Sequence, residues 1–402
     1  GTTALDAITT GDGVTAIGYN ALTASTSGPY NTAVGHGSLS SLTDAQFNTA
    51  VGIEAGIYSN GNYNAFFGAY AGKNKESGGP QTGSSNTAIG YKSMGNGVIT
   101  TAGGNTCVGR ESGLAIVDNV NNTLIGAYSG QNTTGDNNTA LGYNSLNDCT
   151  SGTQNTAVGG YSADNLTTGN YNTALGYNSL AVASDGSSNT ALGWDVLKSC
   201  NGAGNVGVGA EGLRYTTTGE YNVGVGIAAG RDVSTGSDNL CIGRSSGLTG
   251  NPGGAVTTAS GQMCLGGDSI THAFTKVAIS VTSGARDKTD VTPMDLGLEF
   301  INQLEPVTYR WDERIKYSDD QSVVPDGTHK KEQLEGGFLA QDVEALEEKY
   351  GYKQSDKSNL ITTLSSDEKM YSIKYSKFVP MLVKAVQELS AEVEALKSKL
   401  EE

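Results

Sequence analysis

The chain has 402 residues, of which 57 are glycine, and its formal net charge is −16. This acidic balance argues against binding to a phosphate backbone, so nucleic acid is not an expected partner. No stretch approaches the roughly 18 apolar residues of a membrane-spanning helix, so membrane insertion is not expected either. The chain begins at Gly1 without a Met, and we expect it to be a fragment or a processed product.

Two regions of different composition predict two domains. The residues before Ser283 contain 9 Lys+Arg and 17 Asp+Glu, whereas the 120 residues from Ser283 onward contain 16 and 24. Glycine runs the other way, with 51 of the 57 lying before Ser283. Such a change in charge density indicates a domain boundary, and we expect one domain over 1–282 and another over 283–402.

The first domain repeats the unit Asn-Thr-Ala-Val-Gly and its variants. The glycine that ends each unit, here called the anchor glycine, recurs every 16 or 17 residues apart from three longer gaps, which are expected to hold loops such as 77–80 and 251–254. The fifteen anchor glycines are residues 18, 35, 52, 68, 90, 109, 126, 142, 159, 176, 193, 209, 226, 243 and 266. This period suits two short strands and two turns, so it predicts a mainly β fold, a parallel β-solenoid of about 15 coils.

Several positions of the repeat predict how the coils hold together. The residue before each anchor glycine is bulky and apolar in all fifteen copies, and we expect it to form a ladder of core side chains. Asn begins 13 of the 15 units, and stacked Asn side chains can hydrogen-bond from coil to coil. We expect the anchor glycine to take a positive φ or to let backbones approach closely. Aromatic residues after anchor glycines, such as Tyr143, are expected to pack coil on coil as an outward row rather than to bind glycan.

The repeat resembles the heads of trimeric autotransporter adhesins, in which similar units wind a left-handed parallel β-roll, and related units occur in phage tail fibres. The resemblance covers roughly residues 10–270. It implies a trimeric shaft and says little about what the shaft binds.

The second domain carries several spaced motifs in a fixed order. It opens with Ser283-Gly-Ala-Arg286-Asp-Lys288, after a last shaft strand expected over 277–281. Three further motifs follow, over 296–311, 337–343 and 375–389. This order resembles the intramolecular chaperone domain of phage tail fibres and endosialidases, the peptidase S74 family. The resemblance covers 283–402 and implies a small α/β domain that directs trimer formation.

In that family a serine and a lysine cut the chain just before the serine. Carried over, Ser283 is the nucleophile, Lys288 is the base, and the scissile bond is Thr282–Ser283. The reaction implied is a single-turnover cleavage, since the chain is its own substrate. The lysine is needed because a serine hydroxyl attacks only when a neutral base takes its proton. Arg286 would support the pair, since its charge disfavours a second charge nearby. Five residues of separation do not define a contact, so we expect the trimer to bring the pair together, and Gly284 replaces an acidic residue common in the family.

The end of the chain, 378–402, predicts a coiled-coil helix. Its apolar residues alternate at spacings of three and four, which is a strict a/d pattern. These seam residues are Val379, Leu382, Val386, Leu389, Val393, Leu396 and Leu400. An unbroken apolar seam with charged flanks favours self-association over packing against the helix's own domain.

Cysteines and histidines are assigned structural roles. Cys107, Cys241 and Cys264 occupy the small position two residues before an anchor glycine, and the last two fall in neighbouring coils. We interpret them as buried substitutes for alanine rather than as a disulfide or a metal site. The histidines 36, 272 and 329 have no ligand at metal-binding spacing and are expected at the surface, so no metal or cofactor is expected.

These features predict a structural viral protein: a phage tail-fibre or appendage shaft in the virion, with a self-cleaving trimerisation chaperone. The partners expected are further copies of the chain and a glycan or receptor on a host surface. One alternative is a trimeric adhesin on a bacterial cell surface, and another is a fibre whose chaperone domain is retained uncut. An enzyme acting on polysaccharide would need a carboxylate pair that the shaft does not present.

Overall fold

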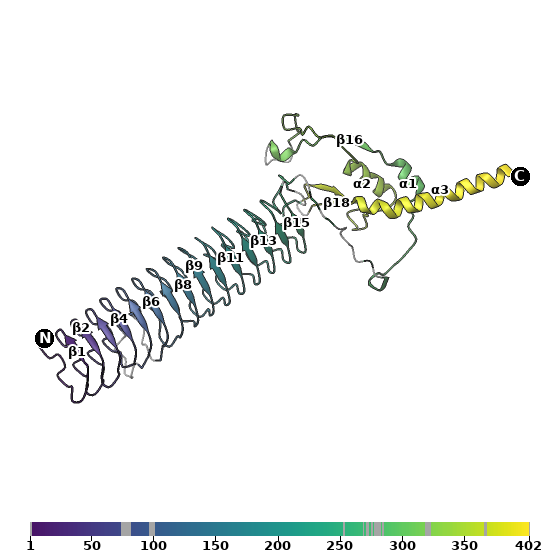
Figure 1. Cartoon of the computed structure of the whole chain (residues 1–402). Helices are drawn as coiled ribbons and strands as arrows, with labels where there is room; N and C mark the ends of the chain where they lie inside the picture. The colour runs from purple at the N-terminus through teal and green to yellow at the C-terminus, as the bar shows by residue number, and fades with distance from the viewer. Residues whose placement is uncertain are drawn as a thin grey trace. The chain divides into compact units, whose positions relative to one another are not determined.

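The chain folds into two compact units, shown in the computed structural model of Figure 1. One unit is made of Gly1–Leu248 and Val256–Gly267, and the other of Thr249–Ala255 and Asp268–Glu402. They are called here the solenoid and the C-terminal unit. The structure describes residues 2–73, 82–95, 101–251, 254–267, 269–270, 273–274, 276, 283, 285–317, 323–365 and 368–401. The loop expected at 77–80, the whole strand expected at 277–281 and His272 lie outside these residues, as do Thr282 and Gly284.

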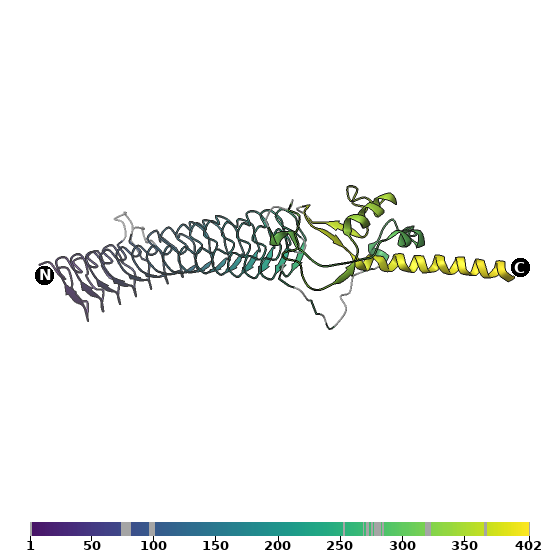
Figure 2. The same cartoon turned by 90° about the horizontal axis from the view of Figure 1, so that it is seen from above.

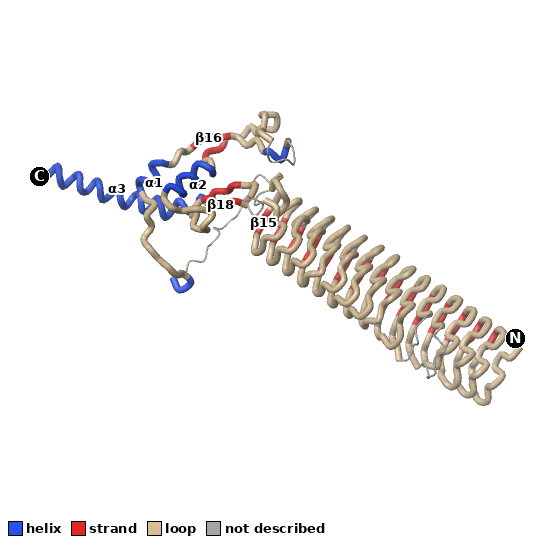
Figure 3. The backbone as a smooth tube through the Cα atoms, turned by 180° about the vertical axis from the view of Figure 1, so that it is seen from behind, coloured by secondary structure: helices blue, strands red, loops and turns tan. Residues whose placement is uncertain are grey.

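The solenoid confirms the predicted parallel coil, with one three-residue strand per repeat. Fifteen strands form a single parallel sheet in chain order, each in register with the next. They are β1 (Thr15–Ile17), β2 (Thr32–Val34), β3 (Thr49–Val51), β4 (Ala65–Phe67), β5 (Thr87–Ile89), β6 (Thr106–Val108), β7 (Thr123–Ile125), β8 (Thr139–Leu141), β9 (Thr156–Val158), β10 (Thr173–Leu175), β11 (Thr190–Leu192), β12 (Val206–Val208), β13 (Val223–Val225), β14 (Leu240–Ile242) and β15 (Met263–Leu265). Figure 2 shows the even stacking of the coils, and Figure 3 shows the strands as one row.

The expectation of two strands per coil is wrong for the described residues, because left-handed backbone turns fill the rest of each coil. Three positions in most coils adopt a positive φ: the residue before the repeated Asn, and the second and fourth residues after the anchor glycine. In one coil these are Tyr171 (φ 60°), Asn178 (φ 57°) and Leu180 (φ 51°). Left-handed residues reverse the chain direction and cannot continue a strand. The coil therefore closes within 16 or 17 residues.

The core ladder lies one position away from where the sequence placed it. The residue before the anchor glycine is buried in none of the fifteen coils, and Leu141 and Leu175 are 46% and 43% exposed. The residue two before the glycine, mostly alanine, is buried in every strand from β2 to β15 instead. Strand side chains alternate between faces, and the narrow coil admits only a small side chain at mid-strand. The bulky position therefore forms an outer apolar row along the sheet, one residue per coil.

The repeated Asn residues form a continuous hydrogen-bonded ladder, as predicted. The side chain of Asn138 accepts a hydrogen bond at 2.9 Å from the backbone N–H of Asn155, in the next coil. The Nδ2 of Asn155 donates to Asn138 Oδ1 at 3.2 Å and to the carbonyl of Gly169 at 2.9 Å. Burial of these amides is tolerated because each finds partners in the adjacent coils. The ladder thus fixes the register of the stack.

Anchor glycines show both of the expected properties. Gly159 has φ +131°, and a Cβ atom built on it would lie 2.6 Å from the carbonyl oxygen of Gly176 in the next coil. Only glycine allows this backbone conformation and this approach together.

Tyrosines directly after anchor glycines, such as Tyr143 and Tyr177, pack coil on coil, but through Tyr161, which is the second residue after Gly159 in the coil between them. Tyr161 makes edge-on contacts with Tyr143 and Tyr177, at centroid distances of 5.3 Å and 5.8 Å. These rings contact one another through their faces and edges, which is the aromatic packing expected between stacked coils.

A partly buried carboxyl group of the solenoid leads to a first prediction. Burial, together with Asp148 in the adjacent coil, raises the pKa of Asp164 to about 6. An unfolded chain releases this proton near pH 4, so stability is lost as pH rises from about 4 to 6. Replacing Asp164 with Asn should raise the thermal midpoint at pH 7.5 by about 2–4 °C, an estimate kept small because the residue is only partly buried.

Thermal melts at pH 4 and pH 7.5 test this expectation. The gain should vanish at pH 4, where the native carboxyl is already protonated. The matched control is the exposed Asp185→Asn in the same solenoid, which should change neither melt. An equal gain at both pH values would show that the effect does not come from the charge of Asp164.

The C-terminal unit is a small α/β unit with two antiparallel hairpins. Strand β16 pairs with β17, and β18 pairs with β19. Its elements are η1 (Ala285–Asp287), α1 (Leu298–Gln303), β16 (Val307–Tyr309), η2 (Arg314–Lys316), β17 (Glu335–Gly337), α2 (Ala340–Lys349), β18 (Thr362–Leu364), β19 (Tyr371–Ile373), η3 (Tyr375–Lys377) and α3 (Phe378–Glu401). The helix predicted over 378–402 is confirmed as α3.

The core of this unit gathers apolar residues from motifs far apart in the sequence. Phe300 of α1, Val343 of α2, and Phe378 and Met381 of α3 lie in one buried cluster. Gly337, at the end of β17, makes room for Tyr375, because a Cβ there would lie 2.4 Å from the Tyr375 hydroxyl. These motif residues therefore help to build the core of the unit.

Candidate functional site

Ser283 and Lys288 lie in direct contact. The Nζ of Lys288 donates a hydrogen bond to the Oγ of Ser283 over 2.6 Å. A single 3-10 turn, η1, reverses the chain between them, and the backbone N–H of Lys288 bonds to the carbonyl of Ala285. The expectation that only a trimer brings the pair together is therefore corrected, because local backbone geometry suffices within one chain.

This pair has the geometry of a nucleophile beside a base. A base must lie within about 2.6–3.2 Å of the hydroxyl oxygen that it deprotonates, and the Lys288 amine lies at that distance. In this contact the amine is the donor, so it has to lose a proton before it can act as the base. Both side chains are exposed, so water reaches them in the single chain. Arg286 lies in the η1 turn two residues before the lysine and is also exposed. The other half of the expected scissile bond, Thr282, lies outside the described residues.

Two carboxylates of the C-terminal unit accept hydrogen bonds from backbone segments distant in the sequence, and no sequence motif indicated these contacts. Glu347 is fully buried and accepts hydrogen bonds from the backbone N–H groups of Leu360, Ile361 and Thr362, and from the Thr362 hydroxyl. Glu388 of α3 accepts a 2.7 Å bond from the N–H of Leu298 at the start of α1, and this bond lowers the pKa of Glu388. Neither partner segment is adjacent in the sequence, so only the fold brings these groups together.

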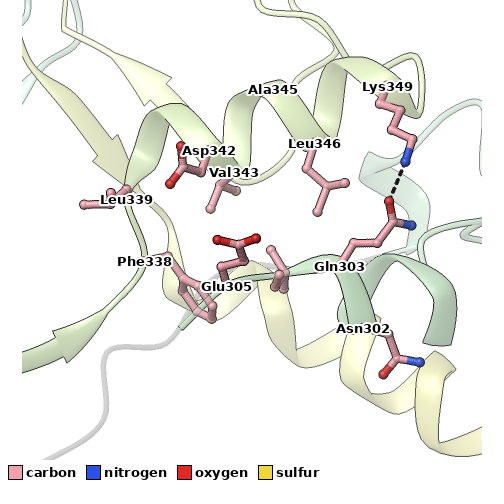
Figure 4. Close-up of a pocket in the computed structure, with 11 residues that line it drawn as sticks. Asn302, Gln303, Glu305, Phe338, Leu339, Asp342, Val343, Ala345, Leu346 and Lys349 are labelled. Atoms are coloured by element: carbon pink, nitrogen blue, oxygen red, sulfur yellow. Dashed lines mark hydrogen bonds between the residues drawn. The ribbon is translucent and has the colours of Figure 1, made fainter. Parts of the chain in front are cut away.

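A cleft of about 640 Å³ lies between the end of α1 and helix α2. Figure 4 shows Glu305 and Asp342 toward one end, while Lys349 donates to Gln303 over 2.5 Å toward the other. Phe338 and Leu339, from the 337–343 motif, line it as well. The lining includes none of Ser283, Arg286 and Lys288, so the cleft and the Ser–Lys pair are separate features.

The seam of helix α3 is a further candidate site, for another chain. Its seven apolar residues are between 41% and 86% exposed. A different face of the helix, with Phe378, Met381 and Ala385, is buried in the unit's own core. The single chain thus leaves the a/d seam uncovered, as it leaves the outer apolar row of the solenoid.

Within the described ranges, no three or more His, Cys, Asp and Glu side chains are grouped so that they could hold a metal ion. None of the helices described has both the length and the apolar character to cross a membrane. His36 is exposed and stacks on Tyr19, and the exposed His329 packs against Tyr317.

Comparison with known proteins supports the interpretation of the C-terminal unit. Residues 283–352 match the Peptidase_S74 family model, described as a chaperone of endosialidase. The match begins at Ser283 and includes Lys288, α1, β16, β17 and α2. It confirms the predicted resemblance over those residues, and the resemblance of the solenoid to adhesin heads stays a prediction. No curated protein matches the chain.

Proposed function

We propose that the chain is the shaft of a homotrimeric phage tail fibre or virion appendage, and that residues 283–402 act as its trimerisation chaperone. In this proposal the chaperone then cuts the chain between Thr282 and Ser283. One observation carries the proposal: the match to a chaperone family begins at a serine whose hydroxyl contacts a lysine amine at 2.6 Å.

Two exposed apolar surfaces support a multimer of this chain. The outer row of the solenoid presents one apolar side chain per coil, and the α3 seam presents seven more. Contiguous apolar rows of this kind mark interaction surfaces, and heptad spacing is the pattern of helices that wind around copies of themselves. Pairing of solenoids in register would cover the outer row, and pairing of α3 helices would cover the seam.

The chaperone role follows from how such a shaft must fold. Every strand pair of the solenoid joins segments 16 to 23 residues apart, and separate chains must also find a common register. Pairing of this kind leaves exposed edges that aggregate while folding is incomplete. A C-terminal unit that associates first would align the chains, and the coils could then form from that end.

A retained chaperone that does not cut is the second candidate. The exposure of both Ser283 and Lys288 favours it, because the single chain lacks the burial that helps a lysine to act as a neutral base. We also propose a host glycan or receptor as a partner and a virion as the location. Both proposals rest on the resemblance to tail fibres.

The sharpest test compares residues 1–282 produced in two ways, by cleavage of the full chain and by expression without residues 283–402. Residues 1–282 released from the full chain by cleavage should form a stable trimer, whereas the same residues expressed alone should aggregate or stay monomeric. The uncut Ser283→Ala chain should sediment at three times its 41.3 kDa mass. Molar mass from sedimentation and circular dichroism of each sample are the measurements.

Variants of the α3 seam provide the matched control. Val386→Lys with Leu389→Lys should behave like the shortened chain, because two charges per helix enter the seam. Gln387→Lys with Ala391→Lys adds the same charge to exposed positions off the seam and should keep the trimer. Equal folding of residues 1–282 by both routes would overturn the chaperone role, and a trimer that survives the seam variant would remove α3 from it.

A further inference from the structure

Two thiols face each other inside the last two coils of the solenoid. Cys241 of β14 and Cys264 of β15 are direct partners in the parallel ladder. Both occupy the inward mid-strand position and are 0% and 5% exposed. Parallel neighbours lie about 4.8 Å apart, which falls within the Cα separations of roughly 4.4–6.8 Å that disulfides span.

None of the other three cysteines has this arrangement. The ladder partners of Cys107 are Ala88 and Leu124. Cys149 and Cys200 donate to the carbonyls of Gly152 and Gly202, and burial raises the pKa of each thiol to about 12. These three thiols are therefore poor nucleophiles, and they serve as internal controls.

The environment of the pair favours reaction at Cys264. The neighbouring Cys241 thiol lowers the pKa of Cys264, and Cys264 in turn raises that of Cys241. The thiolate is the form that attacks disulfides, so the lowered pKa favours Cys264 over Cys241 as the attacking group.

We infer that Cys241 and Cys264 form an oxidisable dithiol whose co-reactant is a low-molecular-weight disulfide. The Cys264 thiolate attacks one sulfur of the small disulfide, forms a mixed disulfide and releases one small thiolate. The Cys241 sulfur, after losing its proton to solvent, attacks the Cys264 sulfur and releases the second small thiolate. Two protein thiols are thus oxidised to one disulfide, and one small disulfide is reduced to two thiols.

The bond would tie down a terminal coil. Among the described residues, β15, like β1 at the other end, has a ladder partner on one side only, so its coil is more prone to open than the inner coils. Side chains directly opposite in a parallel pair stand about as far apart as the strands, wider than the roughly 3.8 Å mean Cβ separation of disulfides. The bond would carry strain and be readily reduced, which makes the lock reversible.

Treatment of the full-length Ser283→Ala protein with cystamine, a small disulfide, tests this site. The native-cysteine chain should lose two of its five free thiols and the mass of two hydrogens, with peptide mapping placing the link between Cys241 and Cys264. This loss should be about tenfold faster than reaction at the other three cysteines. Amide exchange over 263–265 should slow by about tenfold and recover after reduction.

Single alanine variants keep the test decisive, because alanine is the commonest residue of this inner column. Cys241→Ala should form no internal link and should react at Cys264 only slowly, because the neighbour that lowers the Cys264 pKa is gone, and Cys107→Ala should react as the native-cysteine chain does. Five thiols that stay reduced in the native fold would overturn the inference. So would a link that joins Cys264 of two chains, seen as a covalent dimer on a non-reducing gel.

Discussion

Replacing Ser283 with alanine is expected to leave the full 402-residue chain intact, whereas the native chain separates into two fragments that meet between residues 282 and 283. The hydroxyl of Ser283 is the only atom of this residue that can attack the peptide carbonyl, and it lies 2.6 Å from the Lys288 amine. Losing such a nucleophile lowers the cleavage rate by roughly 10⁴–10⁶-fold. Intact-mass spectrometry of freshly expressed protein measures it.

Variants of the neighbouring residues separate the roles of the pair. Lys288→Met should lose cleavage almost as completely as Ser283→Ala, while Arg286→Gln should slow it without abolishing it. Thr289→Ala, whose hydroxyl bonds only to Asp290 among the described contacts, is the matched control and should cut normally. A Ser283→Ala chain that is still cut at this bond would exclude the serine mechanism, and a native chain that is never cut would establish the retained chaperone.

The largest loss of stability is expected from Gly159→Ala. Alanine is strained at φ +131°, and its Cβ would lie 2.6 Å from the carbonyl oxygen of Gly176, so two coils must separate. We expect a cost of at least about 3 kcal/mol and a fall in the thermal midpoint of roughly 10 °C. Thermal melts followed by circular dichroism near 218 nm, a wavelength at about the usual β-sheet minimum, report it.

The residue directly after this glycine is the control. Gly160 does not have a positive φ, and a Cβ there would meet nothing closer than 3.5 Å, the ring of Tyr177. Gly160→Ala should therefore melt within about 2 °C of the native chain. If the two variants melted alike, close approach between anchor glycines would not be what limits the stack.

The period of the repeat was enough to predict the parallel solenoid, because each coil repeats the same contacts. The Asn ladder and the anchor glycine followed from residue chemistry alone. Residue chemistry alone did not identify the inward face of the strands. Side chains alternate along a three-residue strand, so either Ala174 or Leu175 could be the core residue. Hydrophobicity favoured the leucine, whereas the narrow coil selects the alanine.

In the C-terminal unit the sequence predicted which residues matter but not their contacts. Ser283 and Lys288 were identified by resemblance, and only the η1 turn shows that one chain brings them within hydrogen-bond distance. Glu347 and Glu388 gave no signal, because their partners lie 13 to 15 and 90 residues away in the sequence. Contacts of that range depend on tertiary packing, which residue type and spacing do not encode.

The uniform pairing of the coils bears on how a shaft of this kind evolves. Each coil presents the same backbone edge to its neighbour, so coils are interchangeable units of length. Duplication of the gene segment for residues 156–172 would insert one coil and lengthen the solenoid by about 4.8 Å, leaving the sequence at both ends unchanged. Recombination between near-identical repeats can therefore adjust reach in fixed increments, independently of selection on the segments that the shaft connects.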